Sequence, residues 1–189
     1  MYDEIKKCLR KKLSQGRYIH SLGVADEAKR LAVIYGADEG KAYLAGLLHD
    51  CAKEVDDPIK RCGEFSVPLD DVMKSNKGLI HGPLGAEVAR REFGITDEEI
   101  LGAIEFHTVG KPGMTLLEKI IYIADTTEKN RDFDGVSSLR KAVDSDLDKA
   151  ILLSIERHLM ILAKKRTTIH PNTILLWNDL ILNSGGDTK

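Results

Sequence analysis

The chain has 189 residues, of which 42% are hydrophobic and 31% charged, as in an ordinary globular domain. Its 28 basic and 30 acidic residues give a net charge of −2, which argues against a dedicated nucleic-acid or membrane-surface binder. No apolar run approaches the ~20 residues of a membrane span, and the charged N-terminal stretch does not resemble a signal peptide. Three cysteines without disulfide or zinc spacing complete the expectation of a cytoplasmic protein.

Hydrophobic periodicity favours helices along almost the whole chain, and no stretch alternates convincingly at the period of a β-strand. The sequence therefore predicts an all-α bundle. In the first half we expect helices at about residues 2–13, 17–35 and 38–54, a short helix capped by Asp57, another after Pro68, and a longer one from His81.

In the second half, the spacings Thr96–Glu99 and Thr115–Glu118 match a capping box, so each pair predicts a helix start. One long helix is expected from about Val136 to Lys165, and a last helix begins at Pro171 and fades into a flexible tail, residues 184–189. No internal repeat or long linker divides the chain. We therefore expect one domain, with a core region of about 17–128 and the helices of about 136–183 packed on it.

Several ionisable residues fall on apolar helix faces. His20, His49 and His107 lie at helical offsets from small or aliphatic side chains, and Asp125 ends an apolar run. One such histidine is more often a satisfied core residue, but several imidazoles and two carboxylates are most economically neutralised together by metal ions. Because adjacent helix residues are rotated by about 100°, His49 and Asp50 can point to two neighbouring metal positions, with Asp50 bridging them.

The motifs HSLGVADEA, LAGLLHDCAK, LIHGPLGAEVA, AIEFHTVGKPGM and LEKIIYIADTTEKNRDFDGV occur in this order. The series resembles the HD-domain phosphohydrolases and, more closely, the bacterial symmetrical bis(5′-nucleosyl)-tetraphosphatases, over about residues 17–180. The resemblance implies an HD-domain helical bundle with a central dinuclear metal site. It also implies hydrolysis of diadenosine tetraphosphate, and of related dinucleoside polyphosphates, to two ADP.

The same resemblance implies two metal ions, with iron expected and manganese as the alternative. The first ion would be held by four side chains, namely His20, His49, Asp50 and Asp125. A second, more open position would share Asp50 and be completed by His81 and His107.

Four further residues are candidates for contact with the substrate. Lys53 lies one helical turn beyond His49, so it either reaches a phosphate or is simply solvated. Arg131, in the loop after Asp125, has a guanidinium that suits bidentate phosphate binding. Thr108 and Lys111 are weaker candidates for phosphate contact. Asp50, Lys53 and Arg131 are the residues we expect to be catalytic.

Other interpretations remain open on the sequence. Another HD phosphohydrolase would act on a nucleoside monophosphate, guanosine tetraphosphate or a cyclic nucleotide, and a catalytically silent nucleotide-binding module would only regulate. A structural interaction protein would use the helix of Trp177. For His158 we expect a place in the core or in an interface, and a homodimer remains open. The expected partners are a dinucleoside polyphosphate and ADP, without nucleic acid or membrane.

Overall fold

A computed structural model describes residues 2–183, and within that range it contains helices and no strand, which confirms the all-α prediction. The expected tail, residues 184–189, lies outside the described residues. The N-terminal half comprises α1 (Tyr2–Lys12), α2 (Gln15–Tyr35), α3 (Glu39–Leu48), α4 (Pro58–Phe65), α5 (Asp71–Ser75) and the 3₁₀ turn η1 (Lys77–Leu79). The remainder comprises α6 (His81–Phe93), α7 (Glu98–Phe106), α8 (Leu116–Thr127), α9 (Val136–Val143), α10 (Leu147–Lys165) and α11 (Pro171–Asn183).

Short polar side chains start most of these helices by accepting a backbone N–H of the first turn, which would otherwise lack a partner. They are Ser14, Asp38, Asp57, Asp70, Asp97, Thr115 and Asp146. The capping box of Thr115 with Glu118 is confirmed, because both reciprocal bonds form. The one predicted at Thr96 is wrong: Asp97 caps α7, accepting from the N–H groups of Glu99 and Ile100.

Two predicted helices end earlier than expected. The third helix stops at Leu48 instead of continuing to about Glu54, because the chain tightens there into turns with bonds three residues apart, such as Lys53 N–H to Asp50 C=O. The single helix predicted from about Val136 to Lys165 is two helices, α9 and α10. Asp146 separates them, since its side chain caps the N-terminus of α10.

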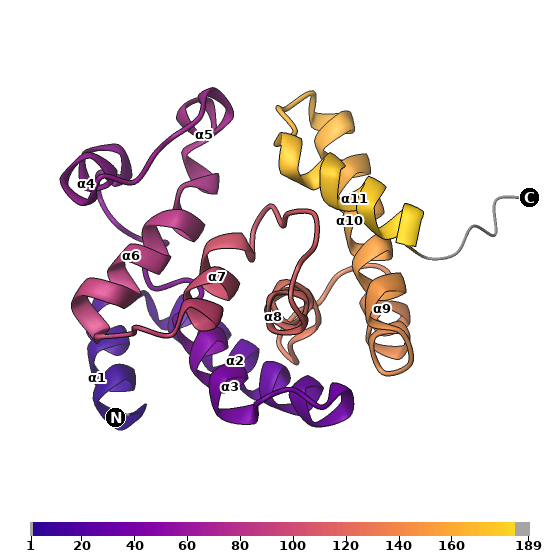
Figure 1. The fold of residues 1–189 in the computed structure, drawn as a ribbon, viewed down its shortest axis with the longest axis horizontal. Helices are drawn as coiled ribbons and strands as arrows, with labels where there is room; N and C mark the ends of the chain where they lie inside the picture. Colours follow the sequence, from indigo (N-terminus) through magenta and orange to yellow (C-terminus); the bar gives the residue numbers. More distant parts are fainter. Residues whose placement is uncertain (1, 184–189) are drawn as a thin grey trace, which may run out of the picture.

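Helix α8 lies at the centre of the fold and contacts α2, α7, α9 and α10 (Figure 1). Helices α2 and α3 pack extensively on each other on one side of it, and α6 packs on α7. The fully buried side chains Leu47, Leu48, Ile104, Ile120 and Ile121 form part of the shared core. Of the other helices on which the motifs were read, α2, α3 and α7 pack against α8, and α6 packs against α7. None of the described helices is both long and apolar enough to cross a membrane.

Candidate metal centre

The six predicted ligands come from five different helices or their ends, and the fold brings them together. His20 lies in α2 and Asp125 in α8, whereas His81 is the first residue of α6. His49 and His107 occupy the equivalent position after the last residue of α3 and α7. All four histidines and Asp50 are buried. A polar cluster of this kind inside a helical core needs a partner for every charge.

The two oxygens of the Asp50 carboxylate face two different pairs of histidines. Oδ2 lies 3.3 Å from His49 Nε2 and 3.8 Å from His20 Nε2. Oδ1 lies 3.2 Å from His81 Nε2 and 3.8 Å from His107 Nε2. The ligand atoms within each of these two groups lie within 4.8 Å of one another. Asp50 therefore belongs to both groups, as a bridging carboxylate would.

Three of the four imidazoles are oriented in the same local way. Nδ1 of His49, His81 and His107 lies 2.7 Å from the carbonyl oxygen three residues earlier in each case. A proton on Nδ1 leaves Nε2 as the atom with a free lone pair, and each Nε2 points to Asp50. The tautomer required of a metal ligand is thus set by the backbone.

His20 is oriented differently, by a carboxylate that is distant in sequence. Its Nδ1 lies 3.1 Å from Oε1 of Glu128, which is 1% exposed, and its Nε2 lies 2.9 Å from Asp125 Oδ1. The other Glu128 oxygen, Oε2, accepts from the backbone N–H and the side-chain amide of Asn130, at 2.7 and 3.0 Å. A carboxylate behind a ligating histidine fixes the ring and makes it a stronger ligand.

A buried atom without a partner tests whether this cluster fits a metal ion. Within residues 2–183, His49 Nε2 has no hydrogen-bond partner although it is buried, which is a costly arrangement for an imidazole nitrogen in a polar cluster. Nearby, Nε2 of His81 and His107 lie 3.0 Å apart. Converging imidazole lone pairs around a shared carboxylate are the donor set of divalent metals such as zinc, iron and manganese. The residues present therefore fit metal ions.

Electrostatics keep the central carboxylate ionised and His107 neutral. Burial alone would raise the pKa of Asp50, but His49 and His81 more than compensate and hold it well below its usual range. Burial and the neighbouring His81 and His49 lower the pKa of His107 to about 3. For His49, burial opposes protonation, yet the adjacent Asp50 carboxylate raises the pKa above its ordinary value. Protons therefore compete with metal for His49 more than for His107.

Cationic and hydroxyl groups surround the cluster on its open side. Lys53 Nζ lies 3.2 Å from both ring nitrogens of His81, and burial lowers the pKa of Lys53. Arg131 donates to the backbone oxygen of Asp125 at 2.7 Å and pairs with its carboxylate. Thr108 Oγ1 lies 3.1 Å from Nε2 of His81 and of His107. These three predicted substrate residues are thus brought to the cluster.

A pocket of about 270 Å³ opens over the cluster. Besides Asp50, Asp125 and the groups around them, it is lined by Tyr122 and by Ser154 and His158 of α10. His158 is not in the core, because it lines this pocket and is exposed; its place in an interface stays a prediction. Lys111 is not brought here: its Nζ lies 2.8 Å from Glu118 Oε1 and borders another cavity.

Two residues of the centre were missed in the sequence. Arg17 donates to Asp50 Oδ2 at 2.6 Å, and Glu128 orients His20. Each lies three residues from a predicted ligand, Arg17 before His20 and Glu128 after Asp125, so that one helical turn places both on the ligand's side. That spacing was the available signal.

Comparison with known proteins agrees with this geometry. Residues 17–130 match the family model of the HD domain. The chain is 41% identical to the symmetrical bis(5′-nucleosyl)-tetraphosphatase of Bacillus subtilis, over 96% of this chain and 98% of that protein. It is 38% identical to the protein of the same name from Staphylococcus aureus, over 91% and 90% of the two chains.

A solved structure is also similar over nearly the whole chain. It is described as a predicted HD superfamily hydrolase involved in NAD metabolism, from Clostridium acetobutylicum. The TM-score is 0.94 and the identity 48%, over 96% of this chain and 97% of the other. The likeness therefore extends beyond the region of the family model to the C-terminal helices.

Proposed function

Because this chain belongs to the HD domain family and, within it, to the symmetrical bis(5′-nucleosyl)-tetraphosphatases, we propose that it hydrolyses diadenosine tetraphosphate. The reaction is metal-dependent and yields two ADP. The observation that carries the proposal is the position of Asp50, one oxygen toward His20 and His49 and the other toward His81 and His107. The proposal treats the chain as one domain that acts in the cytoplasm.

Six side chains would hold two metal ions in this proposal: His20, His49, Asp50, His81, His107 and Asp125. Iron, with manganese as the alternative, is carried over from the family resemblance. Bound ions supply Lewis-acid chemistry, lowering the pKa of water toward neutrality and offsetting charge on phosphate oxygens. The Nδ1 hydrogen bonds of the histidines keep each Nε2 available for this role.

The residues around the cluster bind and orient the phosphate chain. Lys53 and Arg131 offset charge on phosphate oxygens, and the Thr108 hydroxyl donates a hydrogen bond to one of them. Arg17, which also lines the pocket, adds a third cation. Water adds to one of the two central phosphorus atoms, and the bond from that atom to the oxygen shared with the other central phosphorus breaks. That oxygen leaves on the second half of the substrate, the water oxygen stays on the first, a proton is released, and both halves are ADP.

A product assay tests the proposal. Purified protein, with its metal content measured by elemental analysis, is incubated with diadenosine tetraphosphate, and the nucleotides are separated by chromatography. ADP as the sole product is expected, whereas AMP with ATP would contradict symmetric cleavage. The same assay with AMP, guanosine tetraphosphate, a cyclic nucleotide and NAD separates the other phosphohydrolase activities. Bound metal without turnover of any substrate would instead indicate a regulatory module.

A further inference from the structure

Four polar side chains that the mechanism does not use line the pocket over the cluster. They are Tyr122 and Thr126 of α8, and Ser154 and His158 of α10. The members of each pair are four residues apart, so about one helical turn places both on the same face of their helix. Helices α8 and α10 pack on each other. We call the surface that these four residues form the α8–α10 wall.

The hydrogen-bonding groups of this wall are unused. Among the interactions of residues 2–183, none of the four side chains has a hydrogen bond or an ion pair, although Tyr122 is only 8% exposed. Buried tyrosine hydroxyls usually find a partner. By contrast, two of the cations in the same pocket contact predicted metal ligands: Arg17 lies 2.6 Å from Asp50 and Lys53 lies 3.2 Å from His81. The wall therefore keeps its donors for a bound ligand.

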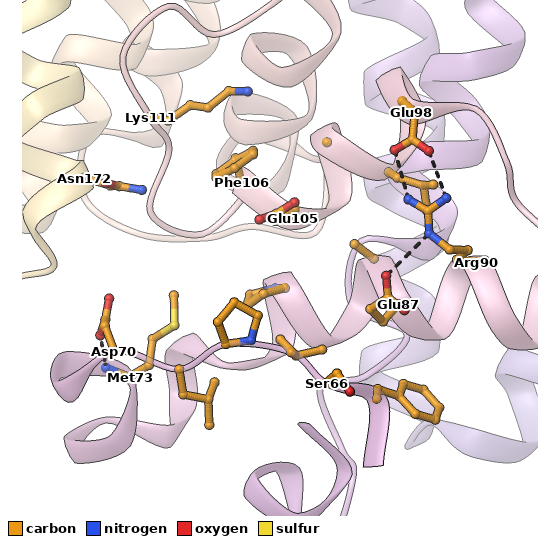
Figure 2. A pocket seen from close by; sticks show the side chains of 18 of the residues that line it. Ser66, Asp70, Met73, Glu87, Arg90, Glu98, Glu105, Phe106, Lys111 and Asn172 are labelled. Atoms are coloured by element: carbon orange, nitrogen blue, oxygen red, sulfur yellow. Dashed lines mark hydrogen bonds and ion pairs between the residues drawn. The ribbon is translucent and has the colours of Figure 1, made fainter. Parts of the chain in front are cut away.

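The basic side chains of the larger cavity, of about 910 Å³, show the opposite arrangement (Figure 2). There Arg90 is paired with Glu98 at 2.8 Å and with Glu87 at 3.4 Å. Lys111 is likewise paired, with Glu118 at 2.8 Å. These groups already have partners within the protein, so unused donors distinguish the α8–α10 wall from the basic groups of that cavity.

The wall offers donors without adding charge. Burial and the neighbouring Arg157 outweigh the opposing effect of Asp125 and lower the pKa of His158, so its ring is neutral at pH 7. A neutral imidazole offers one N–H group, and each hydroxyl offers one O–H group. Oxygens of a phosphate accept such bonds, and a bond to a charged acceptor is stronger than one between neutral groups.

Packing fixes where His158 meets the pocket. Ile155, one turn before it on α10, is fully buried in the core. The guanidinium of Arg157 lies 3.9 Å from the centre of the Phe133 ring, in the loop that also carries Arg131. Helix α10 is therefore held by the core and by that loop, and His158 is placed in the same pocket as Arg131.

The wall and the predicted metal ligands suit different parts of a polyphosphate. Helix α10 carries none of the six predicted ligands and lies beyond residues 17–130, which match the HD domain model. The pocket, at about 270 Å³, has room for about nine water molecules at ~30 Å³ each, which is more than one phosphate group needs. A phosphate at the predicted ligands leaves the wall to the next phosphate along the chain.

We propose that the α8–α10 wall is the subsite for the leaving phosphate, to which His158 donates a hydrogen bond and the three hydroxyl groups add further donors. The inference rests on the proposed function, since it places the half of the substrate that departs. When the bond from the attacked phosphorus to the shared oxygen breaks, the electron pair stays on that oxygen, and the leaving phosphate gains negative charge. His158 keeps its proton. Its hydrogen bond strengthens as the bond breaks, and so it raises kcat.

Two substitutions of His158 separate its hydrogen bond from its packing. His158→Phe keeps an aromatic ring without a donor and should lower kcat for diadenosine tetraphosphate about tenfold, the low end for a hydrogen bond to a charged group, with a smaller change in KM. His158→Gln restores an N–H donor and should recover part of the loss. Glu156→Gln, an exposed site on the same helix outside the pocket, is the matched control. An unchanged kcat in His158→Phe, or an equal loss in both His158 variants, would overturn the assignment.

Binding of two phosphonates gives a readout that needs no turnover. Methylenediphosphonate resembles two linked phosphates, with a charged free end like that of the departed phosphate, and methylphosphonate resembles one. In calorimetric titration of metal-loaded protein, His158→Phe should weaken binding of the diphosphonate about tenfold and leave that of methylphosphonate unchanged. Such a selective loss supports the subsite even if the tetraphosphate is not cleaved. A result without this selectivity refutes the subsite even if cleavage to ADP occurs.

Discussion

Replacement of Glu128 by glutamine should weaken metal binding through His20 without touching a proposed ligand. The Glu128 carboxylate accepts from His20 Nδ1 with one oxygen and from both N–H groups of Asn130 with the other. A carboxamide can satisfy one side only. If it keeps the bonds from Asn130, its NH₂ group faces Nδ1 and drives the imidazole proton to Nε2, the atom that must be free to bind metal.

The expected magnitude follows from these contacts. Loss of the partner behind a ligating histidine lowers metal affinity by about 10–100-fold, or about 1.4–2.7 kcal/mol. If the amide turns its oxygen to His20 instead, the two Asn130 donors lose their acceptor, at about 0.5–1.5 kcal/mol of folding free energy for each bond, because Asn130 is exposed and water can replace the acceptor. Competition with a chromophoric chelator measures the first effect, and urea unfolding of metal-free protein measures the second.

Two further variants test whether the contact between α2 and Glu128 controls metal binding. Gly23 lets α2 approach Glu128, because a Cβ at this position would overlap the Glu128 carboxylate. Gly23→Ala should therefore also weaken metal binding, although every polar group is retained. Glu156→Gln, an exposed site on α10, is the neutral control. Unchanged metal affinity and unchanged stability in Glu128→Gln would show that the hydrogen bond to His20 does not matter.

Three other predictions address the centre and the wider fold. Asp50→Ala should release metal and lower turnover by more than the roughly 100-fold expected for a residue behind a ligand; a metal-loaded, active variant would exclude the bridging role. Arg131→Ala should lower turnover about tenfold or more with full metal content, and elemental analysis that finds metal lost would assign Arg131 to the metal site instead. For Asp70, burial raises the pKa, but hydrogen bonds from Met73 N–H and His170 outweigh it and hold the pKa below its usual value. The stabilisation it provides is therefore present above pH ~4 and is lost as pH falls through the folded-state pKa. Asp70→Asn should be less stable than wild type at pH 7 and approach it in acid, and a constant difference in urea unfolding from pH 7 to 3 would contradict this.

Helix ends show where local sequence was sufficient and where it was not. The box of Thr115 with Glu118 was predictable because both partners lie within one turn. At Thr96 the same spacing failed because the neighbouring Asp97 also caps well, and spacing alone cannot rank two adjacent caps. Helix α3 ends at Leu48, where the chain turns and places Asp50 among four histidines. The histidines come from distant parts of the chain, so the local sequence of α3 does not predict this end.

By itself the sequence determined the all-α class, most helix positions and the order of the histidine and aspartate motifs, because periodicity, caps and motifs are carried by residues close together in the chain. Only the tertiary structure decided which groups face one another. The partner of His20 is Glu128, 108 positions away, and α10 brings His158 to a pocket whose other walls come from earlier helices. Lys111 shows the same limit: a lysine in a glycine-proline loop can reach either a phosphate or a carboxylate, and the packing of that loop against α8 selects Glu118.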